Sequence, residues 1–123
     1  MTVIVKICWL ALAALHLMPA GVLISQALVE RLYSVDPSGD IGLLLRHRGA
    51  LFLGVVIACA WAIWEPGTRR MVVVLVTSSM VSFLWLYFRA GCPTGALRTI
   101  AYADLVGLIP LFVVAYNAWF NAD

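Results

Sequence analysis

The chain contains 123 residues, of which 64% are hydrophobic and only 11% are charged, and its formal net charge at pH 7 is +2. Soluble domains carry about 25% charged residues, so this chain has too few charges to cover a soluble globule, and its long apolar runs predict a membrane protein. A net charge this small, with no basic run, also excludes a surface for nucleic acid.

Cysteine and histidine are too sparse in the sequence to indicate a metal centre. Cys8, Cys59 and Cys92 are isolated, with no CxxC pair among them. His16 and His47 are the two histidines, and neither belongs to a cluster with ligand spacing. We therefore expect no metal site, and no sequence motif indicates a cofactor.

Four apolar segments are long enough to cross a membrane. A bilayer core of ~30 Å requires ~20 helical residues, and because lipid offers no hydrogen bonds to an open backbone, these segments are expected to be helices. The spans are expected at about residues 3–25, 41–64, 71–89 and 97–120. Turn sequences precede the last three spans, at residues 36–39, 65–68 and 91–95. The prediction is an all-α, polytopic membrane protein: a four-transmembrane-helix bundle that forms one domain over residues 1–123.

Local patterns refine this outline. Lys6 followed by an apolar run resembles a secretory signal, but the run is too long and lacks a cleavage site, so we expect a helix of the mature protein. Residues 26–35 are amphipathic and are expected either to extend the first span or to lie at the membrane interface. Ala50, Gly54 and Ala58 form a row of small residues that suits close helix contact in lipid.

The sequence concentrates polar residues at one end of the predicted bundle. Four spans place both chain ends and the 65–70 turn on one side of the membrane, and the 26–40 connection and the 90–96 turn on the other. The positive-inside rule places this second, more polar side in the cytoplasm, but the cation counts become equal if Arg46 and Arg48 belong to a buried site, so the orientation stays open. The tryptophans lie mainly toward span ends and are expected to be interfacial anchors: Trp9, Trp61, Trp64, Trp85 and Trp119.

Asp104 is the central residue of this polar end. It lies about seven residues, or ~10 Å, into the last span, where a carboxylate is costly unless it is protonated or paired. It is either paired with an arginine for structure alone, or it is an acid/base or substrate-anchoring group. Asp104 and His47 are the candidate catalytic groups, because both can transfer protons.

Arg46, His47 and Arg48 lie shortly after the start of the second span. They fan over about 200° of the helix, so only one or two of them can face the bundle. One arginine is expected to meet Asp104 and the other to reach headgroups or the anionic group of a ligand. A basic cluster that contacts lipid phosphates is the alternative.

Further candidates for substrate binding are polar residues near the same end: His16, Arg89, Arg98, Tyr102 and Ser82. Histidines and serines on apolar helices also commonly hydrogen-bond within the bundle or to their own backbone. His16 and Ser82 are therefore compatible with a purely structural role as well.

Three stretches carry a resemblance to known proteins: LLLRHRGALFLG, TSSMVSFLWL and GALRTIAYADLVGLIPL. They resemble a group of small bacterial four-helix membrane proteins whose function is not established, and the architecture is similar to that of DoxX-like bundles. The residues that carry the resemblance are Arg46, His47, Arg48, Ser79, Ser82, Phe83, Arg98 and Asp104. The resemblance implies the bacterial cytoplasmic (inner) membrane and an association with quinone-linked membrane chemistry.

The favoured functional hypothesis is a polar pocket near one membrane face. We expect it to bind an amphipathic lipid, a quinone or an isoprenoid-like molecule, and acid/base chemistry on that ligand is left open. The expected partners are membrane lipids and such a ligand, with a homo-oligomer or a partner membrane protein also open. The first alternative is a non-catalytic accessory subunit of a membrane complex. The second is a proton-coupled small transporter, although small multidrug transporters carry a membrane glutamate in their first span and this chain does not.

Overall fold

A computed structural model describes residues 1–121, and within them the chain is all-α, with no strand. The long helices are α1 (Val3–Gly21), α3 (Asp40–Trp64), α4 (Arg69–Arg89) and α5 (Ala96–Phe120). The short helix α2 (Gln26–Tyr33) joins α1 to α3, and the 3₁₀ helix η1 (Pro66–Thr68) joins α3 to α4. Four helices are long and apolar enough to cross a membrane, which identifies an integral membrane protein and confirms the predicted fold class.

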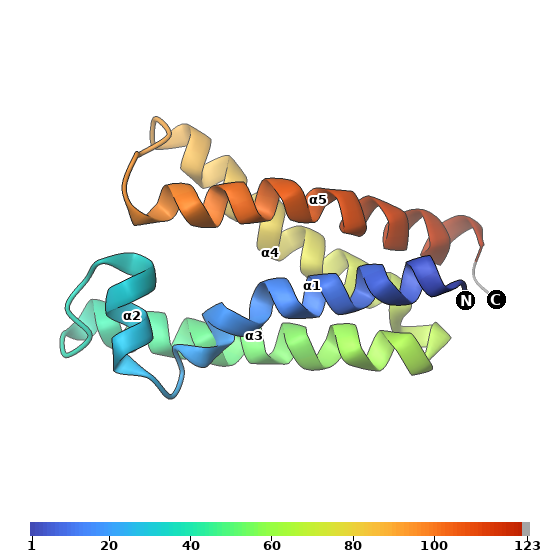
Figure 1. The fold of residues 1–123 in the computed structure, drawn as a ribbon, viewed down its shortest axis with the longest axis horizontal. Helices are drawn as coiled ribbons and strands as arrows, with labels where there is room; N and C mark the ends of the chain where they lie inside the picture. Colours follow the sequence, from blue (N-terminus) through green and yellow to red (C-terminus); the bar gives the residue numbers. More distant parts are fainter. Residues whose placement is uncertain (122–123) are drawn as a thin grey trace.

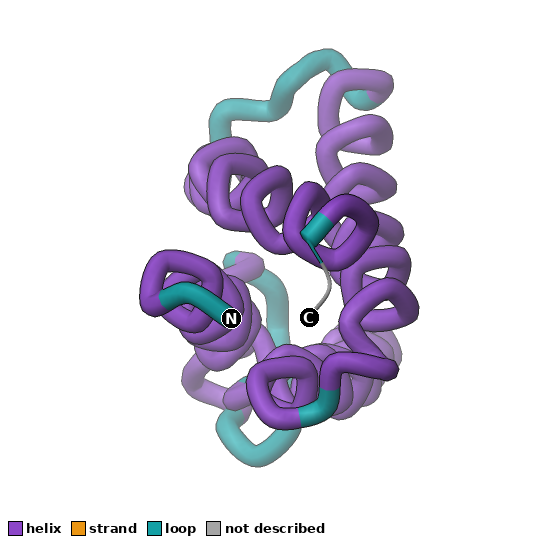
Figure 2. Tube along the Cα trace, turned by 90° about the vertical axis from the view of Figure 1, so that its right-hand side faces the viewer, coloured by secondary structure: helices purple, strands orange, loops and turns teal. Residues whose placement is uncertain are grey.

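The four long helices form a bundle in which each packs against two others. Helix α1 packs on α3 and α5, while α4 packs on α5 and α3, as the view along the bundle shows (Figure 2). The start of α1, the end of α5 and η1 lie together at one end of the bundle, which we call the η1 end (Figure 1). Helix α2 and the connection between α4 and α5 lie at the opposite end, which we call the α2 end (Figure 1).

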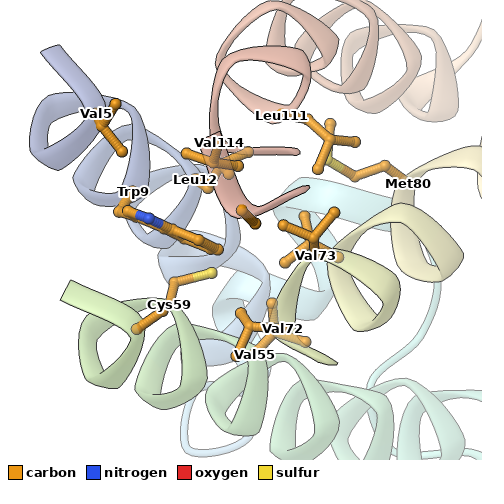
Figure 3. Close-up of a cluster of buried hydrophobic side chains, with 13 residues drawn as sticks. Val5, Trp9, Leu12, Val55, Cys59, Val72, Val73, Met80, Leu111 and Val114 are labelled. Atoms are coloured by element: carbon orange, nitrogen blue, oxygen red, sulfur yellow. The ribbon is translucent and has the colours of Figure 1, made fainter. Parts of the chain in front are cut away.

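The main core is apolar and draws on all four long helices (Figure 3). Its largest member, Trp9 on α1, is fully buried, because it packs among neighbours such as Leu12 and Val114. The expectation that Trp9 is an interfacial anchor is therefore wrong. The other tryptophans are exposed on the bundle surface, as anchors require: Trp61, Trp64, Trp85 and Trp119.

Helix α1 ends at Gly21, four residues before the predicted end of the first span. Short turns follow it, with the amides of Leu23 and Ile24 donating to the carbonyls of Ala20 and Gly21 at 3.2 Å each. Ser25 instead begins the next element, since its hydroxyl accepts from the Leu28 amide at 3.3 Å and so caps α2. Residues 26–33 are thus a helix of their own.

The end of α1 approaches α3 closely at Gly49. A Cβ atom there would lie 2.8 Å from the Leu23 amide nitrogen and 3.2 Å from the Pro19 carbonyl oxygen, so a side chain would displace the backbone. A Cβ atom at Gly54 would meet nothing within 4 Å. Close contact within the bundle is therefore made at Gly49, and Gly54, the central member of the predicted small-residue row, stays exposed.

Candidate functional site

An open groove of about 570 Å³ runs between α3 and α4 from the middle of the bundle toward the α2 end. Its wall combines one arginine and three serines with aromatic and aliphatic side chains. The lining residues are Arg48, Leu51, Phe52, Val55, Leu75, Ser78, Ser79, Ser82, Phe83 and Leu86. A mostly apolar groove with a few polar groups is the usual form of a site for an amphipathic small molecule.

Arg48 is surrounded by aromatic rings at this groove. Its guanidinium carbon lies 4.9 Å from the ring centre of Phe52, 5.8 Å from that of Phe83 and 6.0 Å from that of Tyr33. These rings come from three different helices and hold the cation by cation–π attraction. Within residues 1–121 the guanidinium takes part in no hydrogen bond, so its N–H donors remain available to a bound molecule.

Asp104 carries a carboxyl group that interacts with the charge of Arg48. It is half-buried on α5, and the charge of Arg48 acts on it electrostatically. In the described part of the chain the two side chains do not form a direct ion pair, because no nitrogen–oxygen distance between them falls within 4.0 Å. The arrangement places two opposite charges near one another while leaving the donors of the arginine unoccupied.

His16 lies behind the groove wall, with an exposed fraction of 3%. Its Nδ1 lies 2.8 Å from the Leu12 carbonyl oxygen, and its Nε2 lies 3.4 Å from the hydroxyl oxygen of Ser79 on α4. A carbonyl only accepts, so Nδ1 carries the hydrogen and, in the neutral ring, Nε2 accepts from Ser79. The imidazole also lies 5.7 Å from the Phe52 ring, centre to centre, so Phe52 is a neighbour of both His16 and Arg48.

Tyr33 joins the site from α2, outside the spanning helices. The ring is buried, and burial raises the pKa of its phenol above the ordinary value of 10.0, while the positive charge of Arg48 lowers it by a smaller amount. The phenol is therefore protonated at neutral pH.

The structure separates the predicted site residues into two groups. Arg48 and Ser82 line the groove, and the Ser82 hydroxyl donates to the Ser79 carbonyl at 3.3 Å. His16 contacts the groove wall through Ser79, and Asp104 does not line the groove but lies close enough to Arg48 for their charges to interact. The others lie outside the groove wall. Arg46 donates to the Leu23 carbonyl from Nε and Nη2, each at 3.4 Å, which ties α3 to the end of α1.

The remaining predicted residues are exposed at the α2 end. His47 is exposed on α3. Arg89 lies over the Trp85 ring at 5.4 Å, and Arg98 donates to the Tyr102 hydroxyl at 3.0 Å. These local pairings are typical of interfacial side chains. The catalytic role of His47 stays a prediction, and its exposed position outside the groove wall does not favour it.

Sequence reasoning did not include four side chains that shape the site: Tyr33, Phe52, Phe83 and Ser79. Two signals pointed to them. Phe52 follows Arg48 by one helical turn and so shares its face, and Tyr33 lies on the apolar face of an amphipathic helix. Phe83 and Ser79 are among the residues that carry the family resemblance, without a predicted role in the site.

Among residues 1–121 no group of three or more histidine, cysteine, aspartate or glutamate side chains could hold a metal ion. Comparison with family models, with curated proteins and with solved structures finds no match to this chain.

Proposed function

We propose that this is a bacterial inner-membrane protein, similar in architecture to DoxX-like bundles, that binds an amphipathic lipid, quinone or isoprenoid-like molecule in the α3–α4 groove. The observation that carries the proposal is Arg48. Three rings hold its guanidinium at the groove, and within residues 1–121 no group takes up its hydrogen bonds.

The groove suits the two ends of such a ligand differently. The planar fork of Arg48 favours acceptor oxygens of a headgroup, while Leu51, Leu75 and Leu86 offer an apolar surface to the tail. Asp104, on which Arg48 acts, supplies the proton-transferring group at this end of the site.

The test is native mass spectrometry of the protein extracted from bacterial membranes in mild detergent. The wild type is expected to carry a bound lipid-like molecule that is lost in Arg48→Ala. Arg89→Ala is the matched control, since it removes the same charge from an exposed position near the same end of the bundle. Retention of the ligand by Arg48→Ala at the wild-type level would overturn the proposal.

A non-catalytic accessory subunit is the second candidate, and it is supported by a different surface. Gly54 and Ala58 lie in an apolar depression of about 460 Å³ between α3, η1 and α4, a form that suits the close approach of a partner helix. Gly54→Leu is expected to displace a co-purifying membrane protein under this alternative. Under the ligand-binding proposal the same variant keeps its bound small molecule.

A further inference from the structure

The hydrogen bond between Ser79 and His16 determines whether Ser79 offers a donor or an acceptor to the groove. The Leu12 carbonyl holds the hydrogen of His16 on Nδ1, so Nε2 of the neutral ring accepts the hydroxyl hydrogen of Ser79. That hydrogen therefore points away from the groove, toward a buried ring. Ser79 lines the groove, and because its hydrogen is donated to His16, it offers an acceptor there and not a donor.

This acceptor lies one helical turn deeper than the donors of Arg48. Arg48 contacts Phe83 on α4, and Ser79 precedes Phe83 by four residues, which is about 6 Å along the axis, toward the middle of the bundle. Both side chains line the same groove. A bound molecule thus meets donors near the α2 end and an acceptor further in, where its tail begins.

The charges beside the groove nearly balance. Arg48 contributes one positive charge, and its attraction favours the ionised form of Asp104, although burial opposes it. Tyr33, which also faces Arg48, is neutral at physiological pH. An anionic headgroup would be attracted by Arg48 but repelled by Asp104, so an uncharged oxygen acceptor fits this end best.

From these observations we infer that the groove selects an uncharged amphiphile with a carbonyl oxygen for Arg48 and, closer to the tail, a hydroxyl group that donates to Ser79. The inference rests on the proposed function and narrows it to hydroxylated, carbonyl-bearing lipids. His16 acts as a positioning residue, since it keeps the Ser79 hydrogen out of the groove. If a ketone replaced the ligand hydroxyl, its oxygen would face the Ser79 oxygen. Neither oxygen would then receive a hydrogen bond from the other.

The experiment compares two uncharged probes that differ only at this group, methyl 3-hydroxypalmitate and methyl 3-oxopalmitate. Their dissociation constants are measured with the full chain in lipid nanodiscs at pH 7. The wild type is expected to bind the hydroxy ester about tenfold more tightly, as one net hydrogen bond implies. Ser79→Ala removes this preference. His16→Leu reduces it, because the freed Ser79 hydroxyl can then donate to the ketone.

Thr77→Val is the matched control, since it removes a hydroxyl group from the same helix at a position that does not line the groove. It is expected to keep the wild-type preference. The inference is overturned if the wild type binds the two esters equally or binds neither, or if Ser79→Ala retains the preference. Tighter binding of free 3-hydroxypalmitate than of its methyl ester would overturn the assignment of an uncharged headgroup.

Arg48→Ala separates this inference from the proposed function. If this variant weakens both esters but the wild type shows no preference for the hydroxyl, only the assignment of Ser79 fails. If Arg48→Ala binds both esters as tightly as the wild type does, the groove is not organised around Arg48, and the proposed function fails as well.

Discussion

The arginines of the η1 end and the arginine of the groove use their guanidinium groups in opposite ways. At the η1 end, Arg69 donates from Nε to the Ala62 carbonyl at 2.9 Å and from Nη2 to the Ile63 carbonyl at 3.5 Å. Arg70 donates to the Ala118 carbonyl at 3.0 Å. At the other end, Arg48 contacts aromatic rings and, among residues 1–121, takes part in no hydrogen bond.

The difference separates a structural role from a binding role for the same side chain. The last carbonyls of a helix have no partner within that helix, and in a membrane protein such groups need donors from elsewhere in the chain. Arg69 and Arg70 supply those donors to the ends of α3 and α5. Arg46 does the same for the Leu23 carbonyl, beyond the end of α1. Within residues 1–121 Arg48 donates to no carbonyl, so its donors serve no such purpose.

The largest effect on stability is expected from Arg69→Ala. Arg69 is buried, with an exposed fraction of 4%, and its loss leaves the Ala62 and Ile63 carbonyls without their charged donor. Hydrogen bonds to charged groups contribute about 1.5–3 kcal/mol each, so the free energy of unfolding should fall by about 3 kcal/mol, as measured by reversible denaturation in detergent. Arg69→Lys keeps the positive charge and its donors on a single nitrogen, so its free energy of unfolding should lie between those of the wild type and Arg69→Ala. A loss no greater than that of Arg48→Ala would erase the distinction between Arg69 and Arg48.

A second, smaller effect tests how α3 is held so that Arg48 reaches the groove. Gly49→Ala places a Cβ atom 2.8 Å from the Leu23 amide nitrogen, and forcing the two backbones apart should cost about 2 kcal/mol. The same denaturation assay measures it. Gly54→Ala is the control, because its Cβ atom meets nothing within 4 Å; that variant should be neutral or slightly stabilising, since alanine favours a helix over glycine. Equal costs at both glycines would refute the close approach at Gly49.

Arg48→Ala is expected to lower the free energy of unfolding by only about 1 kcal/mol, through the loss of its cation–π contacts. No carbonyl loses a donor in this variant. Thermal unfolding followed by circular dichroism, beside Arg69→Ala, measures the difference directly. A cost of 3 kcal/mol or more would mean that Arg48 stabilises the fold and would weaken its assignment as a ligand-binding group.

The helices could be predicted closely because lipid imposes their length and the turn residues mark their ends. The first span was the exception. The apolar run continues through Ile24, so composition alone did not indicate that Ser25 caps a separate helix. Trp9 was also misplaced, because a tryptophan near a span end is usually interfacial, and only packing against neighbouring helices could show that it is buried.

The candidate site could be predicted in part. The depth of Asp104 and the run from Arg46 to Arg48 indicated one polar end, and Arg48 and Asp104 do interact there. The rotation of α3 places Arg48 at the groove and Arg46 at the Leu23 carbonyl. Such a rotation results from packing between helices, which the sequence of one helix does not reveal. Phe52 and Phe83 could not be distinguished from lipid-facing residues, since their role comes from facing one cation across two helices.

The smallest expected effect concerns Tyr33, the ring that reaches Arg48 from α2. Burial raises the pKa of its phenol above 10.0 and Arg48 partly opposes this rise, so Tyr33 should ionise above its ordinary range in the folded protein. Folding favours the neutral phenol, and this contribution to stability is therefore complete below pH 10 and is lost as the pH rises through the pKa of the folded state. Ultraviolet absorbance titration of the wild type against Tyr33→Phe isolates this phenol from the other tyrosines. Arg48→Ala should raise the pKa of Tyr33 further, because the phenolate then has no cation beside it, whereas Arg89→Ala should leave it unchanged. A Tyr33 that titrates at or below 10.0, or that does not respond to Arg48→Ala, would show that α2 does not hold its ring against the guanidinium, and the aromatic enclosure of Arg48 would then be incomplete on that side.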